Sequence, residues 1–198
     1  VNGVLQGKTT WKMTDYYSNV VHTSRFEGGI VDGVRYGQGV EIRESEFVAG
    51  QGFESIIVRY EGGWSNNEFS GVGRREELKL KTDGAFEKLT ESGQFSDNML
   101  NGKGIAQRAI ERADGTVIAE RSDGVFENRQ FIGFGALEYS SERDGEIYHS
   151  ISEFEGHIRL GGTGTIEFTD GDRFSGSVAA RGQPQHGNCT LVAKKYDG

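Results

Sequence analysis

Residues 60–73 read YEGGWSNNEFSGVG, a stretch in which rings alternate with glycines and no catalytic group is evident. The stretch ends in a Gly-x-Gly, and the same triplet recurs along the chain with its first glycine at Gly37, Gly71, Gly102 and Gly133. These glycines are separated by 34, 31 and 31 residues. A period this constant indicates a tandem repeat.

Further positions follow the same period. The second glycine of each triplet is Gly39, Gly73, Gly104 or Gly135. An apolar residue stands seven positions before the first glycine: Ile30, Trp64, Phe95 or Phe126. Another glycine stands two positions earlier still: Gly28, Gly62, Gly93 or Gly124. We therefore predict one repeat array over residues 1–198, with a half unit at 1–25 and repeats from about residues 26, 60, 91, 122, 154 and 174.

The segments between the glycines alternate apolar and polar residues, as in GVEIRE (39–44) and GEIYHS (145–150). This period of two predicts half-buried strands. Asp-Gly dipeptides, which favour hairpin turns, stand between such segments at 83–84, 114–115, 144–145 and 170–171. A lone hairpin is marginal in water, so the hairpins must stack. We predict an all-β fold: an elongated, twisted, single-layer antiparallel sheet of about seven tandem hairpins, built like a solenoid.

Glycine weakens a strand unless another group must approach the backbone closely. The recurrent rings are the candidates for that approach. We expect them to lie across the glycines and against rings of the next unit, in place of a conventional core: Phe26, Tyr60, Trp64, Phe95, Phe126, Phe154 and Phe174.

Composition limits the function. The chain has 31 glycines, one proline and a formal net charge of −8. Such an acidic chain is not expected to bind nucleic acid, and an anionic membrane surface is disfavoured for the same reason. The densest basic run, Arg74 and Arg75 with Lys79 and Lys81, is interleaved with acidic residues and favours a solvated strand face over a phosphate site.

Catalytic and metal-binding patterns are weak. The single cysteine, Cys189, excludes an intrachain disulfide framework and favours a reducing compartment. Four histidines fall at irregular positions, without a metal-ligand spacing: His22, His149, His157 and His186. Most aspartates belong to Asp-Gly turns, where they can accept from nearby backbone N–H groups. We expect no cofactor, no metal and no enzymatic activity.

The segments YEGGWSNNEFSGVG and FEGGIVDGVRYGQG (26–39) resemble the MORN repeat, short for membrane occupation and recognition nexus. The resemblance implies an elongated ribbon of hairpins that serves as a scaffold or attachment module, often as a homodimer. Two features depart from the family pattern. The units are longer than its usual repeat, which implies longer hairpins, and Glu91 and Ser122 stand where the family has its first ring.

Stacking the repeats would place the residues two before each Gly-x-Gly in one column: Arg35, Phe69, Leu100 and Phe131. Tyr36, Met99 and Ile132 adjoin this column. One hypothesis is that the column, with these neighbours, is an exposed stripe that binds a protein partner, because contiguous exposed apolar surface marks interfaces. The alternative is that these residues pack on one another or on the following unit.

The sequence thus favours a scaffold that binds partner proteins or a second copy of itself. The alternative is a targeting or membrane-attachment module of a larger, possibly enzymatic, protein, and Val1 in place of an initiator methionine suggests upstream sequence. We expect a cytoplasmic location, with the cytoskeleton and the membrane periphery as further candidates.

Overall fold

The computed structural model describes the backbone of residues 5–15, 20–47, 53–143, 146–157, 161–168, 172–178 and 184–190. Side-chain surroundings are described for residues 20–47, 54–132, 162–165, 172–177 and 186–188. Every regular element in these residues is a β-strand, so the all-β prediction is confirmed.

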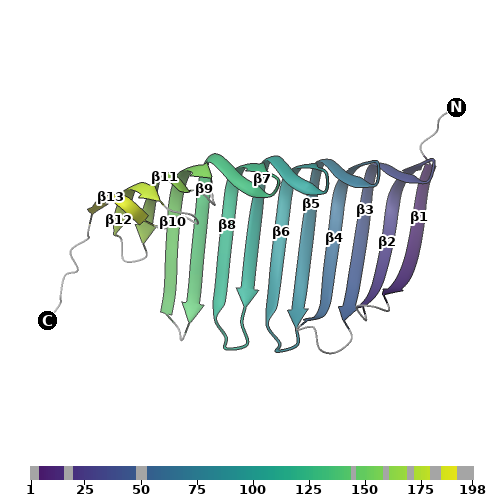
Figure 1. Ribbon diagram of the computed structural model, residues 1–198, viewed down its shortest axis with the longest axis horizontal. Helices are drawn as coiled ribbons and strands as arrows, with labels where there is room; N and C mark the ends of the chain where they lie inside the picture. The colour runs from purple at the N-terminus through teal and green to yellow at the C-terminus, as the bar shows by residue number, and fades with distance from the viewer. Residues whose placement is uncertain are drawn as a thin grey trace.

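Thirteen strands are described, and they form one sheet in chain order, each antiparallel to the next. Figure 1 shows them side by side in a single layer, with the upper ends curled over. The strands are β1 (Leu5–Asp15), β2 (Val20–Val31), β3 (Val34–Phe47), β4 (Phe53–Ser65), β5 (Glu68–Lys81), β6 (Phe86–Ser96), β7 (Met99–Glu111), β8 (Val117–Glu127), β9 (Gln130–Arg143), β10 (Glu146–His157), β11 (Gly161–Phe168), β12 (Arg173–Val178) and β13 (Pro184–Thr190).

A row of glycines crosses the sheet at one level. Each glycine is the register partner of the next, from β1 to β8: Gly7, Gly28, Gly39, Gly62, Gly73, Gly93, Gly104 and Gly124. The row carries no side chain on either face. The strands can therefore curl along this line, and rings from both sides can lie over it.

The curl brings residues from the two sides of the glycine row together. The register partner of Tyr60 on β5 is Arg75, which lies six residues beyond Phe69. Along a flat strand that separation would be about 20 Å. The Tyr60 and Phe69 rings are instead stacked with centroids 3.8 Å apart, so the hairpin end has folded back over the sheet. We call the side that it covers the ring face.

The core lies in this fold. Its buried members, all on the ring face, are Phe26, Tyr60, Trp64, Phe69, Phe95, Leu100, Phe126, Phe131 and Phe174. Tyr60 makes edge contacts with Trp64 and Phe95, with centroids 5.3 Å apart in both cases. Its hydroxyl donates to the Gly63 carbonyl at 3.0 Å, and burial raises the pKa of Tyr60 to about 12. Contact between rings of successive units is confirmed for Phe26 with Trp64 and for Tyr60 with Phe95, whereas the side chain of Phe154 lies outside the described residues.

The two glycines of each Gly-x-Gly have different roles. A Cβ on Gly39 would lie 2.6 Å from Cε2 of Phe26, and one on Gly73 would lie 2.7 Å from Cζ of Tyr60. For these second glycines, the predicted close approach of a ring is confirmed. The first glycines have left-handed φ values, +80° at Gly37 and +71° at Gly71, with open space around them. They provide the backbone conformation of the curl, which the sequence argument did not separate from close approach.

Three other glycines of the Gly-x-Gly triplets do not show these two roles: Gly102, Gly133 and Gly135. Gly102 has a φ of +107° and faces the side chain of Gln94. Gly133 and Gly135 pair in register with Gly156 and Phe154, and their side-chain environment lies outside the described residues.

The hairpin turns at the curled margin are tight, with positive φ at both central residues: Asp32–Gly33, Asn66–Asn67, Asp97–Asn98 and Asn128–Arg129. This is the mirror-image turn that matches the twist of the strands. The predicted Asp-Gly turns lie at the other margin. Asp83 accepts from the Ala85 N–H at 3.0 Å, and Asp114 accepts from the Thr116 N–H at 2.9 Å. The dipeptides at 144–145 and 170–171 lie outside the described residues.

Each hairpin end is bonded to the preceding one. The Asn67 N–H donates to the Arg35 carbonyl at 3.2 Å, and the Arg35 N–H donates back to Oδ1 of Asn67 at 2.9 Å. Asn98 repeats this reciprocal pair with Phe69, at 3.4 and 2.9 Å. A side-chain amide here extends the backbone hydrogen bonding from one unit to the next.

Replacing Asn98 by alanine should therefore lower the free energy of unfolding by about 1–2 kcal/mol, from the lost bond to the Phe69 N–H and the strained positive φ. Urea unfolding measures the change. Asn98→Gly is the matched control, because glycine keeps the φ and loses only the bond. Equal losses of unfolding free energy in both variants would show that the positive φ of residue 98 contributes nothing to the effect of alanine.

Candidate binding surfaces

The predicted partner stripe is not an exposed surface. Phe69, Leu100 and Phe131 are buried in the core, Leu100 completely. The prediction that they form an exposed stripe is wrong, because the curl along the glycine row turns these positions onto the sheet. The alternative, packing on one another and on neighbouring units, describes them correctly. Of the adjoining residues, Tyr36 is exposed on the opposite face, and Met99 and Ile132 are half-buried.

Arg35 heads the same column and takes part in the core. Its guanidinium lies over the Trp64 ring at 4.5 Å and pairs with the Glu41 carboxylate. Glu41 also accepts from Arg43 at 2.6 Å, and its side chain is buried. One carboxylate thus holds two guanidinium groups.

A second buried carboxylate repeats this arrangement. Glu91 accepts from Arg75 at 2.9 Å and from Arg129, in the β8–β9 turn, at 3.2 Å. Arg75 also pairs with Glu77. Burial and the nearby charges of Arg129 and Arg43 lower the pKa of Arg75, whereas Glu91 acts in the opposite direction. The interpretation of Arg75 as part of a solvated face is therefore wrong.

The opposite face of the sheet is uncovered in the described residues and carries apolar side chains. Strand alternation and register place the exposed large ones on this face, spread over β3 to β8: Tyr36, Ile57, Val72, Leu78, Val117 and Val125. Ile57 and Leu78 are direct cross-strand partners, and Val72 is the most exposed at 73%. Sequence alternation signals these strands, but it cannot say which of the two faces stays open.

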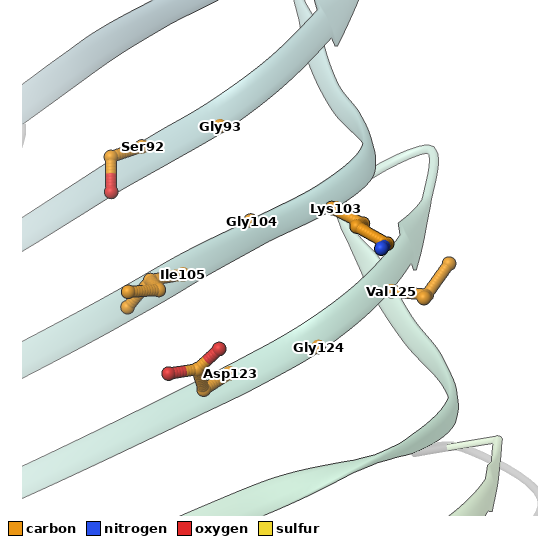
Figure 2. A pocket seen from close by; sticks show the side chains of 8 residues that line it. All are labelled: Ser92, Gly93, Lys103, Gly104, Ile105, Asp123, Gly124 and Val125. Carbon is orange, nitrogen blue, oxygen red and sulfur yellow. The ribbon is translucent and has the colours of Figure 1, made fainter.

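The same face holds a shallow depression of about 480 Å³ over the glycine row (Figure 2). Ser92, Ile105 and Asp123 stand in one row across β6, β7 and β8, and Lys103 and Val125 stand on the other side of the glycines. The side chains flank a floor of bare backbone, and only Lys103 and Asp123 are charged. A shallow depression of this kind is a poor cavity for a cofactor.

Of the histidines and the cysteine, the structure describes the side chains of His22 and His186, which stand on β2 and β13 and do not meet. His22 bonds the hydroxyl of Ser45 at 2.9 Å, and His186 is exposed. His149, His157 and Cys189 lie outside the described side chains. Among the residues that the structure describes, no three His, Cys, Asp or Glu side chains converge as a metal site. The described segments also contain no helix that is long and apolar enough to cross a bilayer.

Comparison with known families agrees with this architecture. The MORN repeat model matches residues 60–76 and 92–109. These two segments contain the Tyr60–Gly73 motif and the glycine pair Gly93 and Gly104. No curated protein matches the chain in sequence. Repeats of this family are generally involved in interactions with proteins or membrane lipids, which is consistent with a binding module.

Proposed function

We propose that this MORN repeat protein is a non-enzymatic scaffold that binds partner proteins along the open face of its sheet. The observation that supports this proposal is the exposure of six large apolar side chains on the face opposite the ring core, among which Ile57 and Leu78 are direct cross-strand partners. Exposed apolar surface marks an interface in many proteins. A protein partner fits this face better than a lipid surface, because the chain has a net charge of −8.

The composition of the face suits a protein contact. Around the apolar residues, charges pair within the face itself: Arg59 with Glu61 at 2.6 Å, and Arg74 with Glu76 at 2.6 Å. A partner that covers the apolar residues would therefore leave few charges unpaired. Homodimerisation through this face and a cytoplasmic or cytoskeletal location remain part of the proposal, as does the alternative of an attachment module within a larger protein.

The test is affinity capture with face-specific variants. Serine at Ile57, Val72 and Leu78 should abolish the capture of protein partners from the native lysate, identified by mass spectrometry, while the urea midpoint changes little. The matched control places serine at Val58 and Leu89, which lie on the ring face. Unchanged capture by the first variant, equal loss in both, or recovery of lipid alone would contradict the proposal.

A further inference from the structure

The ring face carries a local excess of positive charge. Three carboxylates, Glu41, Glu77 and Glu91, each pair with two basic groups. The basic side chains, which we call the arginine strip, are Arg35, Arg43, Arg75, Lys79 and Arg129. Five cations against three anions leave a local charge of +2 in this cluster. Arg108, which pairs with Glu87 and Glu120 on the same face, brings the ion pairs of the ring face to six cations against five anions, in a chain whose net charge is −8.

These charges lie close together. Glu41, Tyr60, Arg75 and Glu91 are successive register partners on β3 to β6. Neighbouring strands are about 4.8 Å apart, so the row spans about 14 Å. Burial lowers the pKa of Arg75, and the charges of Arg129 and Arg43 lower it further because they lie close to its guanidinium.

The excess charge is accessible to solvent. The Arg75 side chain is only 8% exposed and is held by Glu77 and Glu91. Arg43 and Arg129, which are the second cations on their carboxylates, are 44% and 38% exposed. Lys79 is 30% exposed. The buried carboxylates hold the inner guanidinium groups, and the outer cations retain donors that can face a ligand.

Among the described residues, the ion pairs of the opposite face show no such excess. There, arginines and acidic residues are matched one to one: Arg25–Glu44, Arg59–Glu61, Arg74–Glu76 and Arg121–Asp123. The adjacent residues Arg74 and Arg75 therefore belong to different electrostatic environments, although they are neighbours in the sequence.

We propose that the arginine strip binds an acidic segment of a protein partner. An extended chain rich in Asp and Glu could lie across β3 to β6 beside the folded hairpin ends, with its carboxylates on Arg43, Lys79 and Arg129. Guanidinium groups favour carboxylates through charge-assisted hydrogen bonds. The shape favours a single chain over a bilayer, because the strip lies along the folded-back hairpin ends and the chain as a whole would be repelled by an anionic surface.

This site lies on the face opposite the apolar surface and does not depend on it, so each proposal can fail while the other holds. The probe is a fluorescent polyglutamate peptide, with a neutral polyglutamine peptide of the same length for comparison, and fluorescence anisotropy reports binding. The full chain should bind the acidic peptide alone, more weakly as salt rises. Arg43→Gln combined with Arg129→Gln should weaken binding at least about tenfold. The matched control, Arg59→Gln with Arg74→Gln, makes the same charge change on the opposite face and should bind like the parent.

Several results would overturn the proposal. These are no binding by the parent chain, an equal loss in the control pair, or phosphatidylserine vesicles that bind while the peptide does not. If circular dichroism shows that the Arg43 and Arg129 variant is unfolded, Lys79→Gln against Lys88→Gln decides instead. Lys79 lies in the strip, and Lys88 lies on the opposite face. Equal binding by these two variants would count against the proposal.

Discussion

Replacing Tyr60 by alanine should lower the free energy of unfolding by about 3–5 kcal/mol. Tyr60 is fully buried, stacks on Phe69 and contacts the rings of Trp64 and Phe95, so it joins the hairpin end of its own unit to the next unit. Its removal leaves a cavity, and the surrounding rings cannot move to fill it without breaking their contacts with one another. Urea unfolding followed by Trp64 fluorescence, in a Trp11→Phe background, measures the change next to the ring.

A second substitution identifies why Gly73 is a glycine. All three atoms nearest to a Cβ built on Gly73 belong to Tyr60. Gly73→Ala alone should therefore cost about 1–3 kcal/mol by overpacking. In the Tyr60→Ala background the same change should cost almost nothing, because the ring is gone. If the cost of Gly73→Ala is the same in both backgrounds, ring contact is not the reason for the glycine.

The repeat and its fold were predictable because their signals are local and recur. The spacing from Gly62 to Trp64 and from Gly71 to Gly73 reappears in every clear unit, and alternation between the glycines gives strands whatever their neighbours. Close approach of Phe26 to Gly39 and of Tyr60 to Gly73 followed from the same reasoning.

The exposed and buried sides of the hairpin ends were not predictable in this way. Position along a flat strand places Phe69 and Leu100 at a margin, where they look exposed. The positive φ of Gly71 turns that margin back over the sheet. The sequence does not predict whether a glycine within a strand has a positive φ. The apolar face was missed for a related reason, since alternation gives two faces and no sign of which one the hairpin ends will cover.

The buried charges were also out of reach of the sequence. Glu91 occupies a ring position of the repeat, and its second partner, Arg129, comes from the β8–β9 turn of the following repeat. Nothing in the local pattern joins these two residues. Only the register from β6 to β9 and the curl of the hairpin ends bring them together.

Replacing Glu91 by alanine should cost about 3–5 kcal/mol, as much as removing the Tyr60 ring. The cause differs, because the substitution leaves the Arg75 guanidinium buried with only Glu77 to neutralise it. Removing both partners should recover most of the lost stability, because Arg75→Met with Glu91→Leu removes both charges of this buried pair and fills the space with apolar atoms. Urea midpoints of the single and double variants give the comparison.

The exposed pair Arg74–Glu76 lies on the same strand as Arg75 and provides the control, since Glu76→Ala should cost less than about 1 kcal/mol. Suppose that Glu91→Ala costs no more than Glu76→Ala. Water would then reach Arg75 readily, and the inner part of the arginine strip would be solvated. A large loss that the double variant recovers would instead mean that Glu91 acts as a buried counterion, which holds the hairpin end of Arg129 against the sheet and leaves that arginine's remaining donors facing the solvent.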